Sequence, residues 1–362
     1  MANQAPPPRL PFQLFSRWIP EFVANLPITV GGAKVTQLLD NVGYGDMLVL
    51  HAKGTYTGAT ATLVPRGGAP WNLLSNINVQ PPGLTPPVNL SGFMLHLWNL
   101  VEKNFSPFVD GIDFPGQGLD ANAYDAGIMD VMPYAIGAQT LHLWYVIPFH
   151  RSSMDVRGIL PLGNKTRTLL TLSIAAAADI FTVAANFTVP VFTVDVFQAY
   201  LTAAPAGANA DPDPYWAVTY EELTQPIVSQ GDQVVNIEPN DSILGIIHYV
   251  VTGATVVDAG DSGNQTSLSL RVNKSFYHQG LDPVFWHFVQ RRRIGAPLPA
   301  GVICYDFDRF VDDGALDMRE WIHSQDVQSV QSTIRIAGAT LGTAPRVVTS
   351  IKRLVDLAPG AH

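Results

Sequence analysis

Apolar and polar residues alternate with a period of two along much of this chain, and turn residues interrupt the alternation at short intervals. Segments 170–174 and 192–196 place an apolar side chain at every second position. Such a period gives each strand one buried face. The chain also contains 30 glycines and 28 prolines, and prolines at that density exclude coiled coils and helical repeats. Many short strands separated by turns predict an all-β chain of sandwiches or barrels.

Charge is scarce in this sequence, and its scarcity bears on partners. Charged residues make up 14% of the chain, against about 25% in an ordinary soluble domain. A surface so poor in charge is typical of proteins that bury much of it against other chains. The net charge is −9, and only Arg291–Arg293 forms a basic run, so we expect no direct contact with nucleic acid. We also expect no membrane-spanning helix and no secretory signal.

The N-terminal region is predicted to be a Pro-rich arm followed by a short or broken helix. Residues 1–8 carry the prolines, and within residues 13–26 the apolar positions recur at helical spacing, although Pro20 would kink a helix. The apolar set is Leu14, Phe15, Trp18, Ile19, Phe22, Val23 and Leu26. Two interpretations stay open for this segment: packing on a core of its own chain or a neighbour, or lying on a membrane surface.

Two further segments have helical spacing, and both interrupt the strand pattern. The first is 91–104, with Ser91 as its N-cap; the second is 281–294, where Asp282 caps the helix and Pro283 takes its first position. Arg291–Arg293 fill the last turn of the second helix, where cations complement the helix dipole. Their other possible role is pairing with an acidic neighbour.

The order of these elements indicates a duplicated layout. Strands, one helix and strands are followed by the same series, and the two helical segments start about 190 residues apart. Between the two series, a stretch rich in small and turn residues reads as a linker. We therefore predict an arm or short helix at 1–26, one sandwich at 27–203, a linker at 204–216, and a second sandwich with a C-terminal tail at 217–362.

Catalytic and metal-binding motifs are missing from the sequence. The histidines are scattered, with neither a zinc motif nor a nucleophile elbow. Asp306, Asp308 and Asp317 partly match a calcium loop, but Phe310 and Val311 stand where the loop needs an oxygen ligand and a glycine. Cys304 sits in an apolar run and reads as a small buried hydrophobe. We therefore expect no enzyme, no metal and no cofactor, but a structural or binding protein.

Several tracts in sequence order carry a family resemblance. They are Asn41-Val42-Gly43, Gly92–Asn99, Gly137–Pro148, Leu281-Asp282-Pro283, Arg291–Ile294 and Pro299–Asp306. With these tracts the chain resembles the major capsid proteins of tectivirus-like phages, which are double jelly-roll proteins of icosahedral viruses with an internal membrane. The resemblance spans most of the chain, and the 281–294 tract is its most specific part.

The resemblance implies two eight-stranded jelly rolls in tandem, each with one inserted helix. It also implies homotrimers of pseudo-hexagonal outline that form an icosahedral virion shell around a membrane-enclosed genome, after assembly in the host cytoplasm. The implied partners are other copies of the chain, neighbouring trimers, penton and minor capsid proteins, and the internal membrane. Inner-face or membrane contact is expected at Phe15, Arg17, Trp18 and Phe22. Arg291, Arg292 and Arg293 are candidates for contact between subunits.

Two rival functions stay open at this point. One is a two-domain β-sandwich that binds carbohydrate or a host surface, with Trp71 or Trp216 stacking on sugars. The other is a cupin-like or glycosidase jelly roll, against which the scattered histidines argue. The sequence favours the capsid interpretation.

Overall fold

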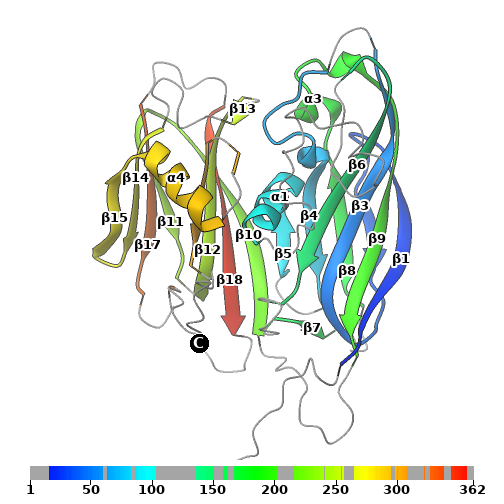
Figure 1. The fold of residues 1–362 in the computed structure, drawn as a ribbon, viewed down its shortest axis with the longest axis horizontal. Coiled ribbons are helices and arrows are strands. Elements are labelled where there is room, and N and C mark those ends of the chain that lie inside the picture. The colour runs from blue at the N-terminus through cyan, green and yellow to red at the C-terminus, as the bar shows by residue number, and fades with distance from the viewer. Residues whose placement is uncertain are drawn as a thin grey trace, which may run out of the picture.

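The computed structural model describes residues 16–59, 63–82, 86–102, 135–150, 158–161, 167–202, 216–239, 241–253, 255–256, 265–294, 298–299, 301–307, 322, 327–337 and 344–356. Phe15, the Pro-rich arm and linker residues 204–215 lie outside these ranges. Within them the chain forms two β-sandwiches that stand side by side (Figure 1).

The first sandwich has two sheets of four principal strands each. One sheet has the order β1 (Trp18–Ile28), β9 (Phe187–Leu201), β3 (Tyr44–Gly58), β6 (Gly137–Pro148). The other has the order β5 (Val88–Leu90), β4 (Leu74–Gln80), β8 (Leu169–Ile174), β2 (Val35–Leu38). The helix α1 (Gly92–Val101) lies between β5 and β6 in the chain. The smaller elements are η2 (Trp71–Leu73), β7 (Leu160–Pro161), α3 (Ala177–Ile180) and η3 (Ala184–Asn186).

The second sandwich repeats this arrangement. One sheet has the order β10 (Trp216–Pro226), β18 (Arg346–Asp356), β12 (Ser242–Thr252), β16 (Val302–Asp306), and β13 (Thr255–Val256) pairs with β12. The other has the order β11 (Gly231–Ile237), β17 (Val330–Ile336), β14 (Gln265–Val272), β15 (Ser275–Leu281). The helix α4 (Pro283–Ile294) follows β15 as α1 follows β5. Both units therefore have the strand order of a jelly roll, with one main helix inserted at the same place.

The strand ladders of the two units can also be matched residue by residue. The β3–β9 ladder shifts register between Gly45 and Met47, and the β12–β18 ladder shifts at the corresponding point, between Ile243 and Gly245. Bulges of this kind are specific features of a ladder, so they align the two sheets. Counting onward from the shifts makes Val49 equivalent to Ile247.

The same argument aligns the helices. Ile77 pairs with Leu90, and at the corresponding place in the second unit Leu268 pairs with Leu281. The residue after each of these leucines is the helix N-cap, Ser91 or Asp282. Each cap side chain accepts a hydrogen bond from the first turn, from Met94 N at 3.3 Å and from Val284 N at 2.7 Å. Both predicted caps are confirmed, and α1 and α4 can be compared from these positions onward.

The two sandwiches are joined through one continuous sheet. β5 of the first unit and β10 of the second pair in parallel, with Tyr220 opposite Val88 and Glu221 opposite Asn89. One hydrophobic core fills the first sandwich and extends through α1 to the outer face of β12 and β18, while a second core fills the other sandwich. The extension of the first core across the junction makes α1 part of the contact between the units.

The short helix predicted within residues 13–26 is wrong. Residues 18–28 form β1, an edge strand that pairs with β9. Trp18, Phe22 and Leu26 recur every four residues, a spacing that suits both a helix and one face of a strand. A bulge between Phe22 and Ala24 then moves Leu26 to the core side. Pro20 is tolerated because an edge strand can leave one main-chain amide out of the ladder.

Two boundaries of the predicted layout change accordingly. The first sandwich begins at Trp18 rather than at residue 27, because β1 is one of its eight principal strands. The linker ends before Trp216, because that residue opens β10.

A pair of N-terminal deletions tests the place of β1 in the fold. Removing residues 1–24 takes away Trp18–Ala24 of β1 and exposes the β9 edge, so we expect a clear drop in the midpoint of thermal unfolding. Removing residues 1–15 spares β1 and the hydrogen bond from Arg17 N to Thr202 Oγ1, so we expect an unchanged midpoint. Differential scanning calorimetry compares the two, and equal midpoints would show that β1 contributes little.

Candidate assembly surfaces

The described residues contain no constellation suited to catalysis or metal binding. Among them, no group of three or more His, Cys, Asp or Glu side chains could hold a metal ion. Cys304 is buried and not in a disulfide, as expected for a small hydrophobe. Asp306 ends β16, whereas Asp308 and Asp317 lie outside the described residues. None of the helices in the described part is long and apolar enough to span a membrane.

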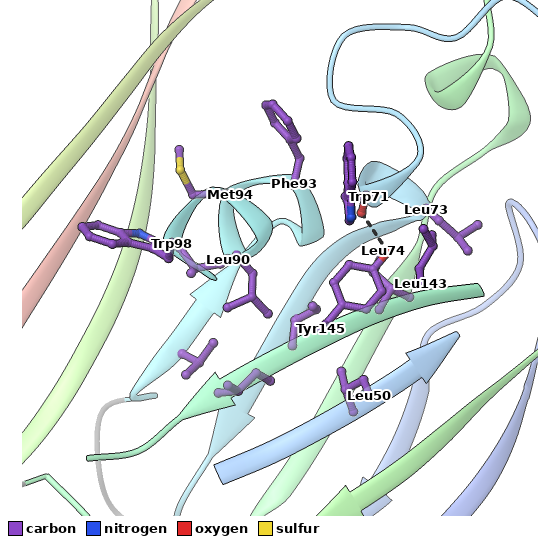
Figure 2. Close-up of a cluster of buried hydrophobic side chains, with 14 of the residues drawn as sticks. Leu50, Trp71, Leu73, Leu74, Leu90, Phe93, Met94, Trp98, Leu143 and Tyr145 are labelled. Atoms are coloured by element: carbon purple, nitrogen blue, oxygen red, sulfur yellow. Dashed lines mark hydrogen bonds between the residues drawn. The ribbon is translucent and has the colours of Figure 1, made fainter. Parts of the chain in front are cut away.

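Trp71 does not form a sugar-stacking platform. Its ring is 6% exposed and stacks on His96 with 3.7 Å between ring centroids. Figure 2 shows it among the buried side chains beside α1, with Tyr145 Oη donating to its main-chain oxygen at 3.0 Å. Burial lowers the pKa of His96 to about 3, so the stacked imidazole is neutral at pH 7. The side chain of Trp216 lies outside the described part.

α1 fills the junction between the two sandwiches. All ten of its residues are buried, including the mid-helix Trp98. The indole Nε1 of Trp98 donates to Ser350 Oγ of β18 at 2.8 Å, and the ring packs so closely on Gly245 that a Cβ there would come within 2.9 Å of it. Phe93 contacts Tyr249 of β12 edge-on, with 5.2 Å between centroids. The helix of one unit therefore docks on the outer sheet face of the other.

A partly buried carboxylate marks the start of this docked helix. Glu222 Oε2 of β10 accepts hydrogen bonds from Ser91 N at 2.7 Å and from Ser91 Oγ at 2.8 Å. Burial raises the pKa of Glu222, and the bonds from Ser91 oppose that rise. The first turn of α1 is thus held by the edge strand of the second sandwich.

An ion pair marks the end of the helix. Glu102 Oε1 lies 2.7 Å from Lys352 Nζ, with side chains 13% and 5% exposed. Tyr220 Oη donates to both carboxylate oxygens, at 3.0 and 3.2 Å, and its ring lies 5.7 Å from the ammonium. Both ends and the middle of α1 therefore contact the second unit.

Each main helix is also anchored to its own sandwich by an amide side chain. With its side-chain amide assigned so that the nitrogen faces the carbonyl, Asn99, eight residues after its N-cap, pairs with the main-chain carbonyl and amide of Val146 at 2.8 and 3.2 Å. Gln290, eight residues after Asp282, donates to the Cys304 carbonyl at 2.8 Å. Val146 pairs with Val49, and Cys304 pairs with Ile247. The two anchors thus end on equivalent strand positions, which supports the alignment of the units independently.

α4 leaves uncovered the face that α1 buries. Val284, Phe285 and Phe288 are 58%, 54% and 63% exposed. The equivalent α1 residues Phe93, Met94 and Leu97 are 6%, 0% and 0% exposed. We call Val284, Phe285 and Phe288 the α4 patch. Three large apolar side chains on one turn of a helix mark an interaction surface.

Among the described residues, the first sandwich also has an outer face that no other element covers, at the far end of the molecule from β15 (Figure 1). Phe22 is 54% exposed and meets Phe197 edge-on at 5.6 Å. Farther across the sheet, His51 stacks on Trp144 with 3.9 Å between centroids. We call Phe22, Phe197 and His51 the β1 face.

Polar groups surround the β1 face. His51 Nε2 lies 3.1 Å from His142 Nδ1. Burial, with His142 nearby, lowers the pKa of His51 to about 4, so it is neutral at pH 7. Asp195 is held by Lys53 and Asn25. Burial acts to raise the pKa of Asp195, but the hydrogen bonds from those two residues, together with nearby positive charge, lower the pKa overall.

The residues singled out from the sequence fall at two places in the fold. Arg17, Trp18 and Phe22 lie at or next to the exposed edge strand β1. Arg291, Arg292 and Arg293 occupy the last turn of α4, as predicted. The sequence alone missed the α4 patch, although Val284, Phe285 and Phe288 follow the expected helix spacing. It also missed the burial of α1 between the units, because the docking surface comes from strands more than a hundred residues away.

No protein-family model and no curated protein matches the sequence. Solved structures do match the fold. The STIV (Sulfolobus turreted icosahedral virus) major capsid protein superposes with a TM-score of 0.66 at 13% identity, covering 94% of this chain and 97% of that one. The major capsid protein of bacteriophage PM2 gives 0.56 at 11% identity, covering 95% and 100%. The PBCV-1 virus capsid protein gives 0.61 at 12% identity, covering 94% of each chain. This chain therefore has the tandem double jelly-roll fold that these viral capsid proteins share.

Proposed function

We propose that this protein is the major capsid protein of an icosahedral virus. The observation that carries the proposal is the match over nearly the whole chain to viral capsid proteins, at both jelly rolls and in their order. The described residues offer large uncovered apolar surfaces and no catalytic constellation, which suits a shell component. The similar proteins come from a bacteriophage and from a virus named for Sulfolobus, so the assignment of this chain to a bacteriophage, which the family resemblance implies, stays a prediction.

The assembly unit that we propose is a homotrimer with a pseudo-hexagonal outline. Each chain contributes two jelly rolls that are equivalent strand by strand, so three chains supply six similar units for one ring. Contacts between neighbouring trimers, and with penton and minor capsid proteins, belong to the same proposal, as does assembly in the host cytoplasm.

Contact with an internal membrane at Phe15, Arg17, Trp18 and Phe22 stays a prediction. Trp18 and Phe22 are 52% and 54% exposed on β1, and exposed aromatic rings suit either a neighbouring chain or lipid headgroups. Contact between subunits at Arg291, Arg292 and Arg293 also stays a prediction. The low charge of the chain and its acidic net balance favour no direct nucleic-acid partner.

The rival carbohydrate-binding function has lost one of its two candidate residues, since Trp71 is a packing residue. We likewise expect no enzymatic activity, and no specific observation on the described residues favours one.

The proposal is tested by the mass and shape of the assembled protein. We expect purified chains of 39.2 kDa to sediment as trimers, and negative-stain images of these particles to show a near-hexagonal outline. At higher concentration, or with the other virion proteins, the trimers should form closed shells. A protein that stays monomeric under all these conditions would contradict the proposed function.

A further inference from the structure

We propose that the α4 patch of one chain docks on the β1 face of a second copy, and that this contact repeats the docking of α1 inside each chain. The inference rests on the proposed function and deepens it by naming the two surfaces that join the subunits. It is argued from the internal alignment of the two sandwiches.

The helix side of the contact is the α4 patch, which corresponds to a buried part of α1. Counting from the N-caps Ser91 and Asp282, the α4 patch occupies the positions of Phe93, Met94 and Leu97 in α1. Those three residues are almost fully buried, and Phe93 packs on Tyr249 of the second sandwich. The α4 patch has the same apolar character at the same positions, but no described part of its own chain covers it. The chain thus contains two similar helical docking elements, one engaged and one open.

The sheet side of the contact follows from the residues of the second sandwich that α1 touches. α1 touches the second sandwich at Glu222, at Ser350 and at Tyr249. The ladder registers fix the equivalents of these three residues in the first sandwich. Val49 pairs with Phe197 as Ile247 pairs with Ser350, so Phe197 corresponds to Ser350.

The two remaining equivalents follow from the same ladders. Phe22 pairs with Phe197 as Glu222 pairs with Ser350, so Phe22 corresponds to Glu222. His51 lies two residues after Val49 as Tyr249 lies two after Ile247. The three contact points of α1 therefore map onto the β1 face, where Phe22 is exposed and Phe197 and His51 are partly exposed.

β15 and β1 lie at opposite ends of the molecule, and α4 lies on the sandwich that ends in β15 (Figure 1). A contact between opposite ends of identical chains is heterologous, and it generates a closed ring when its rotation closes. A ring built this way alternates two similar contacts, one within a chain and one between chains.

The contact within a chain and the proposed contact between chains differ where α1 makes polar interactions. Phe22 replaces Glu222, so the intermolecular contact is more apolar at the start of the helix. At the helix end, Arg293 stands in the position of Glu102, and Ala199 in that of Lys352. Pro20 takes the place of Tyr220, whose amide donates to the Pro87 carbonyl at 2.7 Å. Because proline lacks that donor, we expect side-chain contact rather than a continuous sheet between subunits.

Two surface variants test the inference. We expect the double variant Phe285→Glu/Phe288→Glu and the single variant Phe22→Glu each to sediment as monomers at concentrations where the wild type is trimeric. Val228→Glu is the matched control, because Val228 is 91% exposed and belongs to neither surface. It should remain a trimer. Circular dichroism and the unfolding midpoint check that all variants remain folded.

A mixing experiment identifies the contact as heterologous. Each monomeric variant keeps one intact surface, so an equimolar mixture of the two should form a one-to-one dimer through the α4 patch of one and the β1 face of the other. A symmetric α4-to-α4 contact would give no such dimer, and its absence would contradict the inference.

Chemical cross-linking can detect the contact between chains even where binding is weak. Val284 and His51 correspond to the contacting pair Phe93 and Tyr249. A variant carrying Val284→Cys and His51→Cys should be joined between chains by a short bismaleimide, while either single substitution should not. The native Cys304 is buried and should not react.

The outcomes separate this inference from the proposed function. A wild-type trimer whose α4 variant also remains a trimer contradicts the inference and leaves the capsid function standing. A wild-type protein that never oligomerises contradicts the proposed function itself.

Discussion

Replacing Trp98 with alanine is expected to lower the free energy of unfolding by about 3–5 kcal/mol, as for other large buried aromatic residues. Trp98 is 2% exposed, its ring packs on Gly245, and its indole donates to Ser350 Oγ. The substitution empties the centre of the junction between the sandwiches and leaves the Ser350 hydroxyl without this donor. Urea unfolding followed by tryptophan fluorescence and by circular dichroism measures the loss.

Gly245 makes this prediction specific to the junction. In the wild type, Gly245→Ala would bring a Cβ within 2.9 Å of the Trp98 ring, so we expect it to destabilise by about 1–3 kcal/mol, as overpacking does. In the Trp98→Ala background the nearest neighbour that remains is the Tyr305 main-chain oxygen, 3.2 Å from the added Cβ, so the same change should cost clearly less. Additive effects of the two substitutions would contradict direct packing between the residues.

Removing the cation at the end of α1 should have an effect of similar size. Lys352→Met leaves the Glu102 carboxylate buried without its ammonium partner, and breaking a buried pair in this way costs about 3–5 kcal/mol. The double variant Glu102→Gln/Lys352→Met has no buried charge, and its amide oxygen still accepts from Tyr220 Oη. We therefore expect the double variant to recover most of the loss in chemical denaturation.

An exposed ion pair provides the matched control. Arg335 and Asp232 approach to 3.8 Å with side chains 62% and 57% exposed, and such pairs contribute roughly 0–1 kcal/mol. Arg335→Met should therefore change the unfolding free energy little. If Lys352→Met proved as mild as Arg335→Met, the Glu102–Lys352 pair would not hold the two sandwiches together.

The sequence predicted the local elements well where one physical cause dominates. The helices at 91–104 and 281–294 were identified from their caps and spacing, and Ser91 and Asp282 cap them in the structure. The period-two segments such as 170–174 lie in strands with one buried face. Capping and alternation depend on residues within a few positions of each other, so the sequence carries them directly.

The helix predicted for the N-terminal segment is wrong, and the reason is physical too. Trp18, Phe22 and Leu26 fit a helix and a strand equally well, and Pro20 did not separate the two. The segment is a strand because it pairs with β9, whose partner residues lie more than 160 positions away in the chain. A local pattern cannot report the presence of a distant partner strand.

Residue order alone predicts an all-β chain with two similar halves, each with one inserted helix. It also gives each helix an apolar turn, with Phe93, Met94 and Leu97 in one helix and Val284, Phe285 and Phe288 in the other. The packing of the two sandwiches buries the first set and leaves the second exposed. Burial of a helix face depends on the sheet that lies opposite: parallel pairing of β5 with β10 brings the second sandwich against α1, whereas no described part of the chain lies against the patch on α4.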